Sequence, residues 1–345
     1  MTEAYDGRQI VGMDLHRRRS VLVRMTEDGR KLETARIENS PAALRAVLAR
    51  AGKNPRVVVE ATYGWYWAAD VLQAAGAEVH LAHPLGVKGF TYRRVKNDVR
   101  DASDLADLLR MGRLPEAYLA PPEVRELREI VRHRAKCVAL RSGLKAQVHA
   151  ILAKQGLHLA ASDIFGVRGR ELLAAAELDG PFRIRADAVL RLIDAYDVEV
   201  DTAGGWLRAR LATHDGYHVL QQLPGIGPTL AAVFVAEIGE VDRFTDAAHL
   251  CSWAGLTPRH RESDTKVHRG RITKQGSKLV RWAAVEAAQK IPAGCWLTST
   301  RAAITDRRGH NTATVAVARK LLTLVYYGLR DGEIRALRTR VEAAA

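Results

Sequence analysis

Short apolar segments separated by turn residues open the chain. Residues 9–16, 20–25 and 31–37 are rich in Val, Ile, Leu and Thr, and polar or glycine residues lie between them. Short β-branched runs bounded by turn residues are typical of strands. The pattern predicts three successive strands that form an antiparallel meander.

Helix and strand patterns then alternate as far as residue 111. Ser40 before Pro41 predicts the start of a helix that runs to Ala51, because serine is a favoured N-cap and proline a favoured first residue. The apolar run at 55–61 (PRVVVEA) is typical of a buried parallel strand. Further along we expect a helix over 64–75, a strand over 78–82 and an amphipathic helix over 98–111. The first part of the chain is therefore predicted to be an α/β domain.

The pattern becomes helical after the Pro-Pro pair at 121–122. Residues 123–155 predict one long helix, and 160–213 also have a helical pattern. We expect an α/β domain over 1–120, a helical, coiled-coil arm over 121–215 and a mainly α domain over 216–345.

The long helix has two interpretations. Its polar faces carry many basic residues, so it is either a solvated helix packed on its neighbours or an arm that dimerises through one face and contacts nucleic acid with another. The basic positions are Arg125, Arg128, Arg132, Arg134, Lys136, Arg141 and Lys145.

Composition narrows the classes of protein. The 345 residues are 47% hydrophobic, so the chain is long and apolar enough to fold, and the net charge is +14. This charge favours nucleic acid as a partner, then an acidic membrane surface, with a solvated basic surface as the alternative. Three scattered cysteines indicate reduced thiols. Without a signal or membrane-spanning pattern, we expect a soluble intracellular protein.

Basic residues concentrate in 255–281 (GLTPRHRESDTKVHRGRITKQGSKLVR). We expect a solvated loop here that contacts a phosphate backbone. Ser263 lies within it and is a candidate nucleophile on phosphorus, with Ser252 and Ser277 as competitors and simple hydrogen bonding as the alternative role. The candidate phosphate-binding residues are Arg259, Arg261, Lys266, Arg269, Arg271, Lys274 and Lys278.

Four carboxylates are placed where they could converge at one edge of the predicted sheet. Asp14 lies in the first strand, Glu60 ends the buried strand, and Asp98 and Asp101 share a helix face. Carboxylates that crowd together need a cation, and oxygen ligands suit Mg²⁺ or Mn²⁺. The alternatives are a salt bridge for Asp14, a helix first-turn preference for the pair of aspartates, and ligation by Asp104 or Asp107 instead.

A glycine turn precedes the apolar segment 229–239. In LPGIGP, Gly225 and Gly227 bend the chain before a helix, which exposes amide N–H groups at its N-terminus. This pattern is typical of a helix-hairpin-helix-like phosphate binder, and a tight turn before a buried helix is the alternative.

These motifs together resemble the DEDD transposases of bacterial insertion sequences, which act as bridge-RNA-guided serine recombinases. The resemblance covers nearly the whole chain. It rests on GMDLH, VVVEATYGWYW and KNDVRDASDLADLL in the first half, and on LPGIGPTLAAVFVAEIG, RFTDAAHLCSWAGLTP, RESDTKVHRGRITKQGSKLVRWAAVEAA and HNTATVAVARKLLTLVYYGL in the second. Asp264 follows Ser263 where the family often has a small residue.

The resemblance implies an RNase H-like, RuvC-like first domain and a C-terminal transposase domain. It implies Mg²⁺ held by Asp14, Glu60, Asp98 and Asp101, with Ser263 as the nucleophile that forms a covalent 5′-phosphoserine. It also implies a dimer that assembles into a tetramer with composite active sites, and double-stranded target and donor DNA chosen by a structured guide RNA. The protein would lie in the bacterial cytoplasm, at the nucleoid when active.

Two other functions compete with this one. A metal-dependent nuclease of the junction-resolvase type would use the carboxylates to activate water, with Ser263 only structural. A catalytically inactive nucleic-acid-binding protein would use only the basic residues and the glycine turn.

Overall fold

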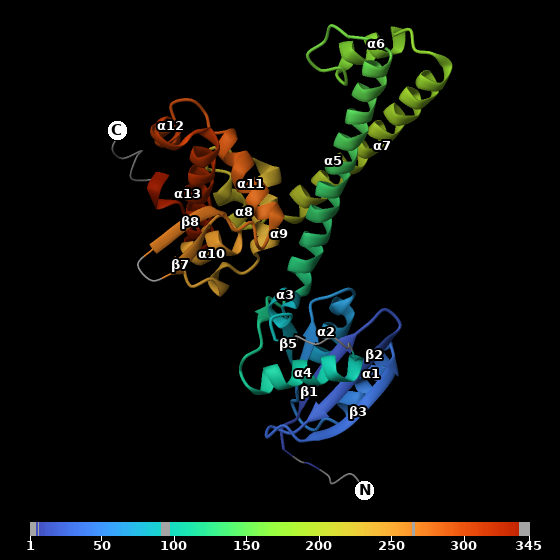
Figure 1. Ribbon diagram of the computed structural model, residues 1–345, viewed down its shortest axis with the longest axis vertical. Coiled ribbons are helices and arrows are strands. Elements are labelled where there is room, and N and C mark those ends of the chain that lie inside the picture. The colour runs from blue at the N-terminus through green and yellow to red at the C-terminus, as the bar shows by residue number, and fades with distance from the viewer. Residues whose placement is uncertain (1–4, 6, 91–96, 264–265, 338–345) are drawn as a thin grey trace. The chain divides into compact units, whose positions relative to one another are not determined.

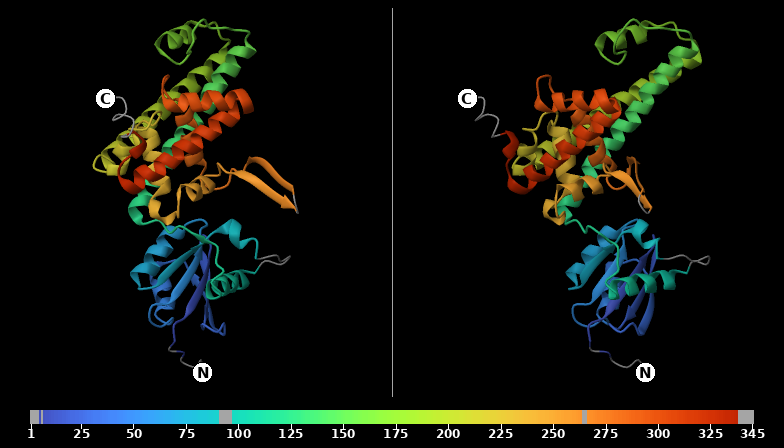
Figure 2. Two further views of the ribbon diagram at one scale, coloured as in Figure 1. Left: turned by 90° about the vertical axis from the view of Figure 1, so that its left-hand side faces the viewer. Right: turned by 60° about the vertical axis from the view of Figure 1, so that its left-hand side comes forward.

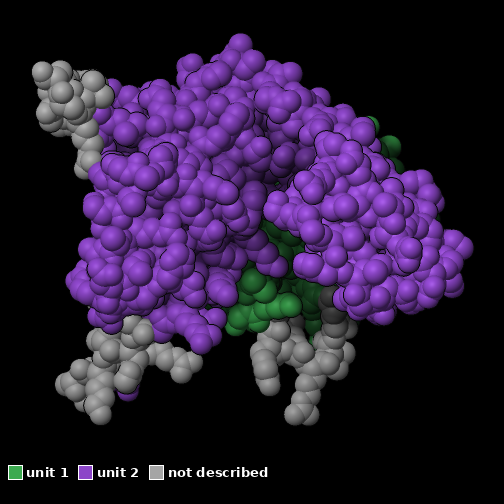
Figure 3. All heavy atoms as spheres, turned by 90° about the horizontal axis from the view of Figure 1, so that it is seen from above, with its two compact units in different colours: residues 1–119 green, residues 120–345 purple. Residues whose placement is uncertain are grey.

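The computed structural model describes residue 5 and residues 7–90, 97–263 and 266–337; the side chains of 261 and 266–269 are also outside the described part. The chain forms two compact units, Met1–Leu119 and Ala120–Ala345 (Figure 1). Figure 3 distinguishes the atoms of the two units by colour. The further division of the second unit into an arm and a C-terminal domain stays a prediction.

A six-stranded mixed sheet forms the centre of the first unit, with strand order β3-β2-β1-β4-β5-β6. The predicted meander is confirmed: β1 (Ile10–Leu15), β2 (Arg19–Met25) and β3 (Lys31–Glu38) are antiparallel. The buried strand β4 (Arg56–Glu60) is parallel to β1 and to β5 (Glu78–Ala82). A two-residue edge strand, β6 (Glu116–Ala117), was not predicted, because it is too short to have a period.

Helices cover both faces of the sheet. The predicted cap is present, since the side chain of Ser40 accepts a hydrogen bond from Ala43 N at the start of α1, and α1 ends before the predicted Ala51. One apolar core lies between the sheet and α1 and α2, and a second lies between the opposite face and α4. The helices are α1 (Pro41–Leu48), α2 (Trp65–Ala74), α3 (Pro84–Val87) and α4 (Asp98–Arg110). The predicted α/β class is confirmed, and the arrangement is consistent with an RNase H-like fold.

Close packing of α4 on β1 depends on Gly12. A Cβ atom at this position would lie 1.9 Å from the backbone oxygen of Ala102 and 2.9 Å from the backbone nitrogen of Ala106. No side chain fits in that space, so the glycine allows α4 to lie directly against the strand that carries Asp14.

The second unit begins with two long helices, α5 (Pro122–Lys154) and α7 (Gly180–Arg210), which pack against each other; α6 (Val167–Ala175) lies between them in the chain (Figure 1). The prediction that Arg125 and Arg128 lie on solvated faces of the long helix is wrong, because both are buried. Arg128 donates hydrogen bonds to the carbonyl oxygens of Ala236 (2.9 Å) and Glu237 (2.9 Å). It therefore neutralises the C-terminal end of another helix instead of contacting a ligand.

The remaining helices pack against α9 (Pro228–Ile238), which is buried from Ala231 to Ile238, or against α13 (His310–Asp331). A single apolar core joins these helices to the base of α5. They are α8 (Asp215–Leu220), the 3₁₀ helix η1 (Val241–Arg243), α10 (Ala247–Trp253), α11 (Lys278–Gln289), α12 (Trp296–Arg308) and α13 (His310–Asp331).

The basic segment is not the loop that we predicted. It contains an antiparallel hairpin of β7 (Pro258–Ser263) and β8 (Lys266–Ile272), which extends away from the helices of the second unit (Figure 2). Two solvated strands can carry charged side chains on both faces, so the charge that suggested a loop is compatible with a ladder of backbone hydrogen bonds. No helix among the described residues is long and apolar enough to cross a membrane.

Candidate catalytic and nucleic-acid-binding sites

A group of possible metal ligands lies at one edge of the sheet of the first unit. Asp14, near the end of β1, is buried, with 8% of its surface exposed, whereas His16 and Asp98 are exposed. His16 Nε2 lies 3.1 Å from Asp14 Oδ2 and 3.6 Å from Asp98 Oδ1. One potential ligand atom from each of the three residues lies within 4.8 Å of the others. The predicted meeting of Asp14 with the start of the helix over 98–111 is therefore present in the fold.

Glu60 lies in the same pocket as Asp14. It is the last residue of β4, which runs parallel to β1, and the carboxyl ends of parallel strands meet at one edge of a sheet. Together with Asp14 and His16 it lines an open pocket of about 610 Å³. Three of the predicted acidic side chains thus come from β1, β4 and the first residue of α4.

Asp101 and the alternative acidic residues lie farther along α4. Asp101 is half-buried, one turn after Asp98, and it is outside the group of three possible ligands found among the described residues. Asp107 forms an ion pair with Arg110, with Oδ1 to Nε at 3.0 Å, which favours a structural role for it. The assignment of all four acidic residues as metal ligands stays a prediction.

The salt bridge given as the alternative role of Asp14 is compatible with its contact to His16, but a part for His16 in holding a metal was not predicted. The signal was a histidine two residues after Asp14, just beyond the strand end, where a side chain can turn towards the same edge. Two carboxylates and an imidazole at this spacing fit a divalent cation, since these side chains are ordinary ligands for one.

Ser263 is the last residue of β7 and is exposed. Its register partner across the hairpin is Lys266. Arg259 and Arg271, one on each strand, are also exposed, as are Lys274 and Lys278 after the hairpin. The side chains of Arg261, Lys266 and Arg269, and all of Asp264, lie outside the described part of the structure.

The two competing serines have other surroundings. Ser277 caps α11, where its Oγ accepts a hydrogen bond from Val280 N at 3.3 Å and donates one to Glu237 Oε2 at 3.3 Å. Glu237 is buried, and Arg132 Nε also bonds to it, at 2.7 Å. Ser277 is therefore part of a structural network, whereas Ser252 is exposed on α10.

The glycine turn lies between α8 and α9. Gly225 has a φ of +81°, and a Cβ there would lie 2.3 Å from Ala287 O, so close packing on α11 requires this glycine. Gly227 is the N-cap of α9 and makes no side-chain cap, and a Cβ added to it would meet no atom within 4 Å. The N-terminus of α9 is thus the part of the turn that offers amide groups to an anion. Phosphate binding by both glycines stays a prediction.

Two sequence families match separate parts of the chain. Residues 11–155 match a family described as Transposase, the DEDD transposases of the IS110 type, and residues 217–293 match the Transposase IS116/IS110/IS902 family. The first match contains Asp14, Glu60, Asp98 and Asp101, and the second contains Gly225, Gly227 and Ser263.

Two individual relatives extend along most of the chain, and a third matches about a third of it. The protein y4qE of Sinorhizobium fredii is 26% identical over 81% of this chain and 70% of its own length. A protein of insertion element IS116 from Streptomyces clavuligerus is 24% identical over 93% of this chain and 94% of its own length. The pilin gene-inverting protein of Moraxella bovis is 31% identical over 33% of this chain and 36% of its own length.

Proposed function

The chain belongs to the DEDD transposases of insertion sequences, and from this membership we propose that it cuts and rejoins DNA through a covalent bond to Ser263, assisted by a divalent metal ion. Its reaction class is that of a DNA recombinase, since both family matches are transposases and one relative inverts a gene segment by name. The observation that carries the covalent step is the exposed serine at the end of a basic hairpin.

The proposed step is a displacement at phosphorus. The Oγ of Ser263 attacks a backbone phosphate, the Oγ–P bond forms, and the bond from phosphorus to the 3′ oxygen breaks. The serine loses its proton and the departing 3′ oxygen gains one, which leaves a 5′-phosphoserine and a free 3′ hydroxyl. The reverse displacement by another 3′ hydroxyl rejoins the strand, so no bond energy is lost between cutting and joining.

The choice of Ser263 is supported by its surroundings. It is exposed, and exposed Arg259 and Arg271 lie on the two strands of the same hairpin. These two arginines lie towards the base of the hairpin and Ser263 at its far end, so they would hold the DNA backbone beside the serine rather than the phosphate under attack. Ser277, by contrast, is already engaged in capping a helix and in a bond to buried Glu237.

We assign the metal to the edge of the first unit's sheet. Asp14, Asp98 and His16 would hold it, with Glu60 in the same pocket, and Asp101 is proposed as a further ligand. Mg²⁺ is the proposed ion because carboxylate oxygens dominate the set, and Mn²⁺ is the alternative that best accepts the imidazole. When bound, the ion would supply positive charge to phosphate oxygens. The chain's own contribution is to hold Asp14 and Asp98 close together through β1 and α4, with His16 between them.

Guide RNA and a tetramer complete the proposal. The net charge of +14 favours a polyanion as a partner, which is compatible with an RNA as well as with DNA. Delegating sequence choice to base pairing would leave the protein to hold backbones through Arg259, Arg271, Lys274, Lys278 and the N-terminus of α9. Composite sites shared between subunits are proposed on the resemblance alone.

A hydrolytic nuclease is the second candidate. The observation that favours it is that Asp14, His16 and Asp98 could hold a cation without any residue of the second unit. Metal-activated water would then cut DNA and leave no protein–DNA bond.

Covalent trapping separates the two candidates. Labelled DNA that spans the element's junction is mixed with the protein, its RNA and Mg²⁺, and the mixture is denatured with detergent. We expect an adduct that resists denaturation, is lost in Ser263→Ala and is retained in Ser252→Ala, whose serine is exposed in the same unit. Cleavage in Ser263→Ala at the wild-type rate would establish the nuclease instead.

A further inference from the structure

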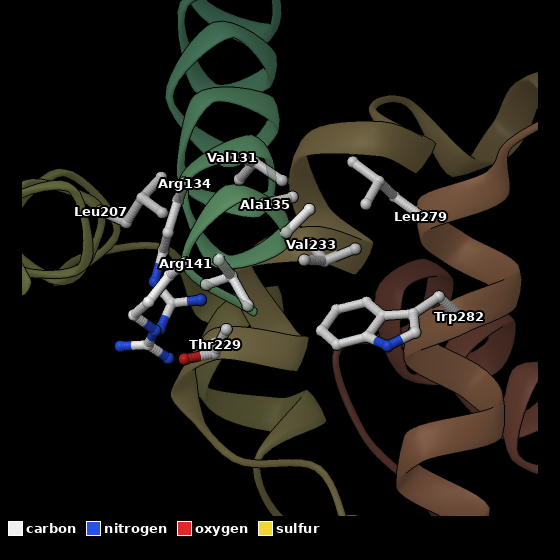
Figure 4. A pocket seen from close by; sticks show the side chains of 11 residues that line it. Val131, Arg134, Ala135, Arg141, Leu207, Thr229, Val233, Leu279 and Trp282 are labelled. Atoms are coloured by element: carbon white, nitrogen blue, oxygen red, sulfur yellow. The ribbon is translucent and has the colours of Figure 1, made fainter. Parts of the chain in front are cut away.

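A second pocket lies within the second unit, apart from the serine and the carboxylates. It has a volume of about 410 Å³ and is bounded by α5, α7, α9 and α11 (Figure 4). Its walls are mostly apolar, and its size falls in the range of pockets that hold small organic groups. The apolar lining includes Val131, Val138, Leu207, Val233, Leu279 and Trp282.

One side of the pocket is cationic. Arg134 and Arg141 line it, and Figure 4 shows their guanidinium groups near the hydroxyl of Thr229, across the pocket from the helix that carries Trp282. The buried Nε atoms of both arginines have no hydrogen-bond partner within the described part of the chain. Those Nε atoms are enclosed by the protein, so an acceptor on a ligand would meet the terminal nitrogens of the guanidinium groups, and two guanidinium groups on one wall suit an anion.

The local charge balance favours an anion. Arg134, Arg141 and Arg208 lie near one another, while Arg141 is paired with Asp197 and Arg134 is influenced by Asp201. Burial lowers the pKa of Arg134, and the neighbouring charges of Arg141 and Arg208 lower it further. Three guanidinium groups thus share two carboxylates, and an added anion would relieve their repulsion.

The N-terminus of α9 adds a second source of positive potential. Thr229 lies in the first turn of this helix, and Gly227 at the N-cap provides no side chain to bond the free amide groups. The partial positive charge of a helix N-terminus attracts phosphate. The helix end, the threonine hydroxyl and the two arginines therefore converge on the same side.

The opposite side offers an aromatic surface. Trp282 lines the pocket and keeps 41% of its surface exposed, although a tryptophan of this size is usually well buried. Its ring extends into the pocket in Figure 4. A flat aromatic ring beside an apolar wall is the ordinary receptor for an unstacked nucleic-acid base.

We propose that this pocket binds one unpaired nucleotide of single-stranded DNA, with its base against Trp282 and its phosphate at Arg134, Arg141 and Thr229. The proposal rests on the recombinase function above, since strand exchange requires DNA to be opened and unpaired bases to be held. An apolar peptide would offer no anion to the two arginines, whereas a nucleotide carries both a flat base for Trp282 and a phosphate for the cationic side.

The test is binding of a labelled single strand of about eight nucleotides, and of the matching duplex, measured by fluorescence anisotropy. Trp282→Ala is expected to weaken single-strand binding by about 5- to 100-fold, the value of one stacked base, and to change duplex binding by less than about twofold. Trp282→Phe should restore most of the affinity. Trp206→Ala is the matched control, because Trp206 is 39% exposed and lies outside the pocket lining; it should bind both DNAs like the wild type.

The cationic side has its own variant. Arg134→Gln is expected to weaken single-strand binding. It should also make the slope of log K against log salt concentration shallower by roughly 0.7, the value of one lost phosphate contact on a single strand. Because Arg134 lies among like charges, the variant should melt at the same temperature as the wild type or higher. A loss of binding without unfolding would then be a direct effect.

Three results would contradict the proposal that this pocket binds an unpaired nucleotide. The first is unchanged single-strand binding by Trp282→Ala. The second is an equal loss of affinity for the single strand and for the duplex. The third is a loss of affinity in Trp282→Ala for an RNA strand of the same sequence but not for the DNA strand. The recombinase function is tested separately, by whether the protein forms a covalent adduct with DNA. If the wild-type protein forms no adduct but binds single strands through Trp282, the proposed recombinase function is wrong and the proposed nucleotide-binding pocket is supported.

Discussion

Replacing Gly12 with alanine should separate two residues of the candidate metal site without touching either. The new methyl carbon would lie 1.9 Å from Ala102 O, whereas a carbon–oxygen contact needs about 3.3 Å, so α4 must retreat by roughly 1.4 Å. The nearby backbone nitrogen of Ala106, at 2.9 Å, prevents a simple sideways escape. Asp98 moves with the helix, so the distance between its Oδ1 and His16 Nε2, now 3.6 Å, would increase.

The expected losses are of two kinds. Overpacking of this sort costs about 1 to 3 kcal/mol, which lowers the melting temperature of a unit this size by roughly 4 to 12 °C. A displacement of about 1 Å in an active site costs on the order of a hundredfold in rate. The assays are calorimetric melting, titration with Mn²⁺ and the rate of DNA cleavage at a temperature where the variant is folded.

Gly143→Ala is the matched control, because Gly143 lies within α5 and an added Cβ there meets no atom within 4 Å. Alanine is the better helix former, so this variant should melt at the same temperature or higher. If Gly12→Ala melts and cleaves DNA like the wild type, the close approach of α4 does not position Asp98, and the reasoning fails.

Other predictions concern the two units separately. Hydrogen bonds from Arg50 and Arg24 hold the pKa of Glu33 below its ordinary value of 4.5. The stabilising contribution of Glu33 is therefore present above that pH and is lost as the pH falls through the pKa of the folded state. Glu33→Gln should lower the free energy of unfolding more at about pH 7 than at about pH 3 in urea titrations. Arg128→Met should cost roughly 2 to 3 kcal/mol in the same titrations, because two carbonyl oxygens at the end of α9 lose a charged donor; an unchanged midpoint would contradict this. Glutamine at Arg259 should weaken duplex DNA binding and reduce its salt slope by about 0.9, and an unchanged slope would exclude it as a phosphate contact.

The order of elements in the first unit could be predicted because each had a local signal. β1 to β3 are short β-branched runs between turns, and Ser40 with Pro41 marks a helix start. The same strand and helix positions predicted that four carboxylates could converge at one edge; Asp14 and Asp98 meet there with His16, Glu60 lines the same pocket as Asp14, and Asp101 lies outside the group. A salt bridge of Asp14 with a neighbour was an alternative, but the approach of His16 to Asp98 was not predicted, because a residue just past a strand end has no fixed direction until the fold is known.

Prediction was poorer where tertiary contacts decide. The burial of Arg128 depends on the carbonyl oxygens of Ala236 and Glu237, which are more than a hundred residues away in the chain. The hairpin of β7 and β8 was predicted as a loop, because its charged residues hide the alternation that identifies a half-buried strand. The pocket beside Trp282 combines four helices, and no local pattern indicates it.

The most direct test of the account is to identify the residue that becomes linked to DNA. The denatured adduct is digested with a nuclease, which trims the DNA, and with trypsin, which cuts after Arg261 and Lys266 and leaves the linked nucleotide on the peptide Glu262–Lys266. Fragmentation of that peptide in a mass spectrometer assigns the added phosphate mass to one side chain. The account predicts Ser263; the mass on Thr265 or on any other peptide, or cleaved DNA with no linked peptide, would contradict it.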